Sequence, residues 1–445
     1  MSGAIPRLKH AGTGRRIGLI FGSRSVEREI SIMTASKIYE VLLSLQDQFE
    51  TLPIFLTAEG AWLTGEAVRD LLTVDAEIRK LAERSVMAGT AERSKLDAEK
   101  LWLNRDRYTP QLDNLDRGLS ATGVEPLFLA PDPSVGALVP QQERKGWLRK
   151  QLHPTIDVAF PVIHGTHGED GTIQGLCELA DLPYVGAGVT ASAVGMDKII
   201  SKLIFQGAGL PVVEGIGITR RELLEDEAAV VKGIERRLSY PVVVKPAVAG
   251  SSVGIGMAHD AAEALSLAKR AMRFSSRVLI ERAVEQRVEV QCGVLGNHAL
   301  TVSECEEIIS SGEVVGYRDK YPEDTQPGSA DLAPSVIPAR IPQALSDEIR
   351  SMAAAAFKAI DSRGISRVDF LIDSAAMKPY VNEVNTMPGS LSFTLWEGSG
   401  VKPAELVVRL VELALEAHRE KRSTHFKSTE GRALVDRRHL VTPGK

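Results

Sequence analysis

Short apolar runs alternate with an amphipathic stretch at the start of the chain. Residues 17–23 and 51–56 are apolar runs of strand length, and the stretch after Ser31 repeats apolar residues every three to four positions. Such runs predict buried strands, and the longer period predicts a helix with Ser31 as its N-cap. Strand, helix and strand in this order predict a parallel α/β sheet, which binds ligands at the carboxyl ends of its strands.

This pattern is interrupted and then resumes. Residues 65–132 are first charged and alanine-rich and then polar with few core candidates, which predicts a surface insertion. A further buried strand is predicted within residues 156–163, followed by a helix over 172–180 and a short strand at 184–185. We therefore predict an N-terminal α/β domain over residues 1–190.

Two further blocks and a tail follow. Residues 191–285 contain an apolar strand candidate and then a glycine-serine loop, and residues 286–418 end in a helix. One face of that helix is apolar and comprises Leu406, Leu410, Leu413 and Ala417. Residues 419–445 carry eight Lys/Arg against three Asp/Glu, which predicts a disordered basic tail.

Composition excludes several classes of protein. A length of 445 residues suits about three domains, and the net charge of −5 gives no basic excess for nucleic acid. The three cysteines lack the spacing of a zinc site or a disulfide framework. Neither a membrane span nor a secretory signal is recognisable, so we expect a cytoplasmic protein without membrane association.

A cluster of oxygen-bearing side chains stands near the end of the third block. Arg367 and Asp369 lie in one apolar segment, and Glu383 and Asn385 lie in the next, about a dozen residues later. If the two segments pair as strands, these side chains lie together. Carboxylates and an amide beside an arginine suit Mg²⁺ and a phosphoryl group, which predicts an ATP-consuming enzyme.

The glycine-serine loop at 250–254 follows Lys245 at the end of a predicted strand. Glycines let backbone N–H groups approach phosphate oxygens, and a lysine adds charge. The loop lacks a Walker A ending, so an ordinary turn is the alternative. Lys198 is a second candidate for phosphate binding, or a solvated helix residue.

Two residues follow strand ends in the first domain. Glu27 can neutralise a substrate ammonium group, or it can hydrogen-bond the start of its own helix. His164 begins a glycine-rich loop after a buried strand, a setting that favours a site.

The motifs together resemble those of D-alanine–D-alanine ligases, members of the ATP-grasp superfamily. They occur in the family's order at 25–31, 164–175, 196–198, 245–254, 320–321, 367–369 and 383–389. The resemblance covers residues 17–60 and 154–417. It implies a Rossmann-like N-terminal domain, a central ATP-grasp lid domain over residues 191–285 and a C-terminal catalytic ATP-grasp domain over residues 286–418.

The resemblance also implies site residues, carried over position by position. The residues implied for ATP binding are Lys198, Lys245, Ser252, Glu281, Arg282, Ala283, Val284, Glu289 and Lys320. Those implied for catalysis are Glu27, Ser251, Tyr321, Arg367 and Gly389. Those implied for substrate binding are Glu27, His164, Ser390, Thr394 and Leu395, with Thr394 where the family usually has serine. The implied ligands of two Mg²⁺ or Mn²⁺ ions are Asp369, Glu383 and Asn385.

The implied reaction is ATP-dependent joining of two D-alanines through an acyl phosphate, for peptidoglycan precursor synthesis. The segment around 314–331 departs from the family's pattern, so D-lactate, D-serine or another D-amino acid stays open as the second substrate. A nucleotide-binding regulatory homologue is a further alternative. Family members are commonly homodimers, and we expect the same here.

Overall fold

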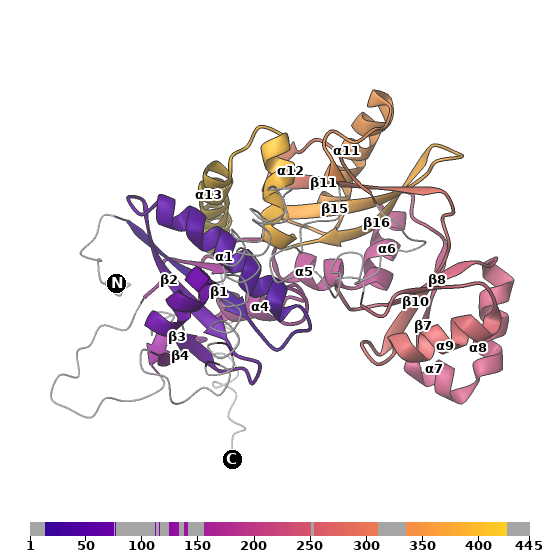
Figure 1. Ribbon diagram of the computed structural model, residues 1–445, viewed down its shortest axis with the longest axis horizontal. Coiled ribbons are helices and arrows are strands. Elements are labelled where there is room, and N and C mark those ends of the chain that lie inside the picture. Colours follow the sequence, from indigo (N-terminus) through magenta and orange to yellow (C-terminus); the bar gives the residue numbers. More distant parts are fainter. Residues whose placement is uncertain are drawn as a thin grey trace, which may run out of the picture.

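In the part of the chain that the structure describes, three β-sheets are surrounded by helices (Figure 1). The computed structural model describes residues 14–74, 76, 112, 115, 124–132, 138–140, 155–250, 253–309 and 335–424. The N-terminal sheet lies at the left of Figure 1, the central sheet at the lower right, and the third sheet between and above them.

The N-terminal sheet contains the predicted parallel strands. β1 (Arg15–Gly22) pairs in parallel with β2 (Phe49–Leu56) on one side and β6 (Val158–Pro161) on the other. Residues 17–22 of β1 are buried, as a strand covered on both faces requires. The predicted parallel α/β sheet is confirmed, although the predicted strand at 184–185 is reduced to one bridge between Ala159 and Tyr184.

Both ends of the region predicted as a surface insertion belong to the domain core. β3 (Trp62–Thr64), β4 (Glu125–Leu129) and β5 (Leu138–Pro140) extend the sheet by antiparallel pairing. Leu127 and Leu129 on β4 are buried, and so are the leucines of helical residues 66–74. Most of the intervening sequence lies outside the described residues.

The first helix, α1 (Arg28–Ser44), begins earlier than predicted. Ser31 is inside the helix and fully buried, so its prediction as the N-cap is wrong. Its hydroxyl accepts a hydrogen bond from the Gly22 N–H and donates one to the Val162 carbonyl. The serine thus satisfies backbone groups at two strand ends, while Glu27 occupies the N-cap position.

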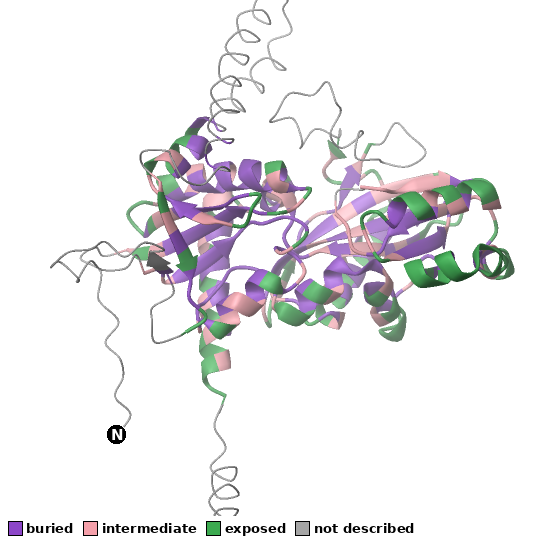
Figure 2. Ribbon diagram, turned by 90° about the horizontal axis from the view of Figure 1, so that it is seen from below, coloured by how far each residue is buried: buried purple, intermediate pink, exposed green. Residues whose placement is uncertain are grey.

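The central sheet is small and antiparallel. Its strands, in spatial order, are β7 (Gly215–Thr219), β10 (Arg277–Arg282), β8 (Val242–Pro246) and β9 (Gly256–Ala258). Its helices are α7 (Arg220–Glu225), α8 (Glu227–Arg237) and α9 (Ala261–Ala271). Figure 2 shows their outer faces exposed and the strands buried.

The third sheet carries the longest antiparallel pairings. β11 (Arg287–Gly296) pairs with β15 (Gly364–Asp373), which pairs with β16 (Lys378–Asn385). On the other side of β11 lie β12 (Leu300–Val302), β13 (Glu306–Ile308) and β14 (Ser335–Val336). α11 (Gln343–Ala359) covers this sheet with an apolar face.

Most of residues 189–207 lie in the range predicted for the central domain, but they form two helices that pack against the third sheet. α5 (Val189–Met196) and α6 (Lys198–Gly207) contribute Ala191 and Phe205 to the core cluster that contains Val368 and Val384. Hydrophobic periodicity shows which face of a helix is buried but not which sheet covers it, so the sequence could not assign this partner.

The last helices join the third sheet to the first. A 3-10 turn, η1 (Gly389–Ser392), leads into α12 (Phe393–Gly398) and α13 (Pro403–Arg422). The predicted apolar face of α13 is confirmed, since Leu406, Leu410, Leu413 and Ala417 are all buried. α13 packs into the N-terminal core and extends four residues beyond 418. Glu178 lies near the end of α4 (Thr172–Leu179). It forms ion pairs with Lys421 of α13 and with Arg363.

No helix within the described residues combines the length and apolarity that crossing a membrane requires.

Candidate active site

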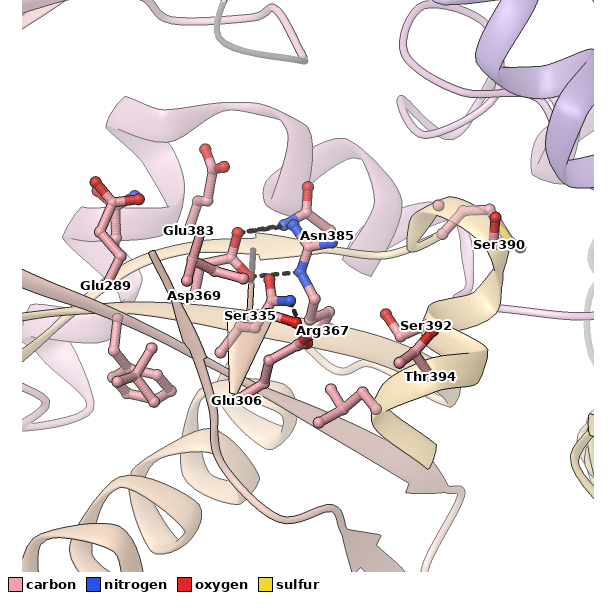
Figure 3. A pocket seen from close by; sticks show the side chains of 18 of the residues that line it. Glu289, Glu306, Ser335, Arg367, Asp369, Glu383, Asn385, Ser390, Ser392 and Thr394 are labelled. Atoms are coloured by element: carbon pink, nitrogen blue, oxygen red, sulfur yellow. Dashed lines mark hydrogen bonds and ion pairs between the residues drawn. The ribbon is translucent and has the colours of Figure 1, made fainter. Parts of the chain in front are cut away.

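A cavity of about 730 Å³ lies between the three sheets. Its lining includes Glu27 and His164 from the N-terminal domain, Lys245 from the central sheet, and Arg367 and Asp369 from the third sheet. Figure 3 shows the part formed by the third sheet and η1. A single concave site therefore draws on residues from all three sheets of the described part of the chain.

The acidic cluster assembles through strand register. Asp369 on β15 lies opposite Glu383 on β16, and Arg367 lies opposite Asn385. Residues two apart on a strand share a face, so all four side chains project from one side of the sheet. The register shifts immediately after Asp369, which bends the pair at this point. The sequence prediction that these residues come together is confirmed.

Arg367 holds Asp369 with both arms of its guanidinium group. Its Nε and Nη2 atoms lie 2.7 and 2.8 Å from the two carboxylate oxygens, and the Asn385 amide donates to the same carboxylate over 3.1 Å (Figure 3). Burial alone would lower the pKa of Arg367, but Asp369, with Glu383 and Glu306, outweighs burial and raises it. The arginine is therefore a permanent cation in the cavity.

The donor set fits a hard cation. Asp369 and Glu383 offer carboxylate oxygens, and Asn385 carries an amide oxygen, which matches Mg²⁺ when phosphate and water complete the coordination. Of the residues that the structure describes, no three His, Cys, Asp or Glu cluster as a protein-only metal cage.

Three lysines pair with two carboxylates, the partly buried Glu383 and the buried Glu281. Lys198 Nζ lies 3.2 Å from Glu383 and donates to the Ala249 carbonyl over 2.8 Å. Lys245 Nζ lies 2.5 Å from one oxygen of Glu281, and Lys202 is paired with the other. Burial alone would raise the pKa of Glu281, but the two ammonium groups lower it.

The sequence reasoning missed Lys202. It is 5% exposed, and burial lowers its pKa, against the opposing effect of Glu281. The spacing of the two lysines could have identified it. Lys202 stands four residues after Lys198 on α6, so both side chains lie on the same face of the helix.

The remaining nucleotide candidates lie along the same wall. Glu281, Arg282, Val284 and Glu289 line the cavity, and Glu289 accepts a 2.9 Å hydrogen bond from Arg287. Ala283 is buried and bonds the Pro241 carbonyl through its N–H. Four predicted site residues lie outside the described residues: Ser251, Ser252, Lys320 and Tyr321.

Glu27 lies beneath two glycine loops. A Cβ atom on Gly165, or on Gly250 of the central domain, would collide with its carboxylate. Glycine is therefore required at both positions for the loops to approach this carboxylate so closely. The central domain thus reaches across the cavity to the N-terminal site.

His164 and Glu169 are buried beside Glu27. Burial, aided by Arg367, lowers the pKa of His164 to about 4 against its bond to the Met387 backbone, so the ring is neutral near pH 7. Burial and the charge of Glu27 raise the pKa of Glu169 to about 8, although it accepts hydrogen bonds from the N–H groups of Gly165 (2.8 Å) and Met387 (3.2 Å). The sequence reasoning gave Glu169 no role.

The turn η1 is a strained element of the site. Ser390, Leu391 and Ser392 have φ values of 48°, 51° and 51°, the left-handed region that costs an L-residue about 1–2 kcal/mol each. Gly389 and Ser390 line the cavity at its start, and Thr394 and Leu395 line it in the helix that follows. Such strain persists only where surrounding contacts hold it.

Comparison with known proteins identifies one family. Models of the D-ala D-ala ligase N-terminus and C-terminus match residues 16–187 and 204–412. The D-alanine--D-alanine ligase of Acetivibrio thermocellus is 38% identical over 414 residues, covering 92% of this chain and 98% of the relative. The ligase of Geobacillus thermodenitrificans is 36% identical, covering 91% and 97%.

Solved structures agree with this match. The D-alanine-D-alanine ligase from Coxiella burnetii superposes with a TM-score of 0.68 at 26% identity, covering 92% of this chain and 96% of that one. A D-Ala:D-Ser ligase from Enterococcus faecalis has a TM-score of 0.68 at 28% identity, covering 90% and 100%.

Proposed function

The chain belongs to the D-alanine–D-alanine ligase family, and on that premise we propose that it joins two D-alanine molecules with ATP, releasing ADP and phosphate. The observation that carries the proposal is the meeting of Arg367, Asp369 and Glu383 with the buried Lys245 and Glu27 around one cavity, with the buried Lys198 paired to Glu383. The product is D-alanyl-D-alanine, a peptidoglycan precursor.

The lysines and acids serve the phosphoryl transfer. Lys198 and Lys245 bind the phosphates of ATP, and the wall from Glu281 to Glu289 binds the nucleoside. Asp369, Glu383 and Asn385 hold the Mg²⁺ or Mn²⁺ ions, which neutralise negative charge on the phosphates when bound. The γ-phosphoryl group passes to the carboxylate of the first D-alanine, whose ammonium group Glu27 neutralises. An acyl phosphate results.

Arg367 and Gly389 serve the second step. The amine of the second D-alanine attacks the acyl carbon, and the developing oxyanion is stabilised by the Arg367 guanidinium and the Gly389 N–H. The C–O bond to phosphate then breaks and phosphate leaves. Exclusion of water protects the acyl phosphate, consistent with the close approach of Gly250 to Glu27.

One observation keeps a second candidate substrate in view. A structural relative at 28% identity is a D-Ala:D-Ser ligase, so D-serine is the alternative second substrate. We propose further that the protein is a homodimer of the reducing cytoplasm, where Cys177, Cys292 and Cys305 stay unbridged as they are here.

The test is phosphate release by the purified protein with ATP and Mg²⁺, with products identified by mass. We expect D-alanine alone to give the dipeptide and equimolar phosphate. Glu383→Gln, which removes one carboxylate charge, should lower turnover about a thousandfold and weaken the dependence on Mg²⁺. Phosphate release only when D-serine is added would favour the second candidate, and no release with any amino acid would contradict the proposed reaction.

A further inference from the structure

The strained turn after Gly389 is held from the N-terminal domain by three buried side chains. Thr34 is fully buried on α1, and His164 and Glu169 come from the loop after β6. The turn lies in the C-terminal part of the chain, more than two hundred residues from all three. The contact therefore joins two domains at the edge of the cavity.

The hydrogen bonds form a directed chain. The Ser390 N–H donates to Thr34 Oγ1 over 3.1 Å, and Thr34 Oγ1 lies 2.9 Å from His164 Nε2. Since Thr34 accepts from Ser390, its own hydrogen can go to the neutral imidazole. The ring also interacts with the backbone of Met387, so His164 contacts the turn both directly and through Thr34.

Glu169 adds the other anchor. One of its oxygens accepts from the Met387 N–H over 3.2 Å, and the other accepts from Gly165 in its own loop over 2.8 Å. Met387 and Ser390 thus bracket Gly389, whose N–H points to the reacting group in the proposed mechanism. The three left-handed residues begin at the second of these anchors, Ser390, and continue with Leu391 and Ser392.

We propose that Thr34 is a positioning residue that acts with His164 and Glu169 to hold the turn 387–392 in the conformation that receives the second amino acid. The inference rests on the proposed ligation, because it assigns to this turn the orientation of the attacking substrate. Thr34 itself does not line the cavity, so it acts through the turn rather than by touching a substrate.

The position has a specific consequence for coupling. A turn that relaxes from the left-handed conformation misplaces the second D-alanine but leaves the nucleotide wall unchanged. The acyl phosphate then persists longer and reacts with water, giving D-alanine and phosphate without a peptide bond. We call the contacts of Thr34, His164 and Glu169 with this turn the clamp. Loss of the clamp should therefore raise the ratio of phosphate released to dipeptide formed.

The test compares Thr34→Val, which removes the buried hydroxyl at nearly constant shape, with Thr34→Ser, which keeps it. Thr64→Val is the matched control, because Thr64 is also buried in the N-terminal sheet, on β3, and its hydroxyl donates to the Pro53 carbonyl over 2.7 Å rather than to the turn. We expect Thr34→Val to raise the KM for the second D-alanine about tenfold, as for one lost buried hydrogen bond, and to raise the phosphate-to-dipeptide ratio above one. Thr34→Ser and Thr64→Val should keep a ratio of one.

A second measurement keeps the inference testable if the ligation itself fails. Hydrogen exchange of the amides of Met387 and of residues 389–392 should quicken in Thr34→Val and stay unchanged in Thr64→Val, whichever substrate the enzyme uses. An unchanged coupling ratio together with unchanged exchange in Thr34→Val would overturn the clamp. Absence of dipeptide from the unaltered enzyme, with quickened exchange in the variant, would reject the proposed function and retain the clamp.

Discussion

At the scale of single residues, the cavity pairs its own cations with its own carboxylates. Lys198 is paired with Glu383, Lys245 with Glu281, and Arg367 with Asp369. Buried charges are tolerated only when paired, so these contacts keep the site stable without a nucleotide. In the proposed mechanism the lysines move to the phosphates, and the carboxylates then need other partners.

Lys202 is placed to be that partner for Glu281. With Lys202→Met, Glu281 must retain Lys245, and ATP has to compete for the lysine. We expect the KM for ATP to rise about tenfold, because the change corresponds to the free energy of one hydrogen bond to a charged group. The KM for D-alanine should stay unchanged. Lys202→Arg should restore most of the affinity.

The control for this prediction is Lys269→Met. Lys269 pairs with Glu227 on the surface, with both side chains about half exposed, so its removal should change neither KM. Equal effects of the two methionine variants, measured by initial rates at varied ATP, would contradict the role given to Lys202.

Glu169 predicts a pH dependence of stability. Its pKa is about 8 in the folded protein against 4.5 ordinarily, so the folded state binds an extra proton between these values. Stability from this group is therefore complete at low pH and is lost as pH rises toward 8. His164, lowered from 6.5 to about 4, acts in the opposite direction at pH 4 to 6.5.

The measurement is the thermal midpoint from pH 6.5 to 8.5, where the His164 contribution is constant. The midpoint should fall with rising pH in the unaltered protein and fall less in Glu169→Gln, which cannot ionise. Parallel curves for the two proteins would show that Glu169 titrates normally.

The sequence predicted the polar cluster on β15 and β16, but not the buried residues Thr34 and Glu169 that hold the neighbouring turn. Arg367 and Asp369, like Glu383 and Asn385, stand two residues apart in an apolar segment, a spacing that can be recognised without a structure. Thr34 and Glu169 act through contacts between domains, and neither periodicity nor spacing encodes such contacts.

At the scale of elements, α13 fastens the C-terminal part of the chain onto the N-terminal sheet. Its apolar face packs in one cluster with Ile17 and Phe21 of β1. Leu410→Ala leaves a cavity in this cluster and should lower the free energy of unfolding by about 2–5 kcal/mol. Leu203, which is 58% exposed on α6, is the control, and Leu203→Ala should change it little.

Urea denaturation measures both variants. Equal small changes in the free energy of unfolding would mean that α13 is not part of the cooperative core.

The apolar face of α13 was predicted from its helical period, and the strands β1, β2 and β8 were predicted from short apolar runs. The sheet partners of α5, α6 and α13 were not, because an amphipathic face can be buried by any of the three sheets.

At the scale of the whole molecule, function depends on three sheets that share one cavity. In the proposed mechanism, the central and third sheets bind the nucleotide, and the N-terminal domain binds the first amino acid; all of them contribute residues to the cavity. Gly250 of the central domain closes over Glu27, and the turn after Gly389 is anchored in the N-terminal domain. Because the reacting groups come from different domains, closure both assembles the site and excludes water.

The central claim is that a carboxylate oxygen of the first D-alanine becomes part of an acyl phosphate. The most direct measurement supplies D-alanine labelled with ¹⁸O in its carboxylate, together with unlabelled ATP, and determines the mass of the released phosphate. The account predicts one ¹⁸O atom in each phosphate released with a dipeptide. Dipeptide formation with unlabelled phosphate would contradict it.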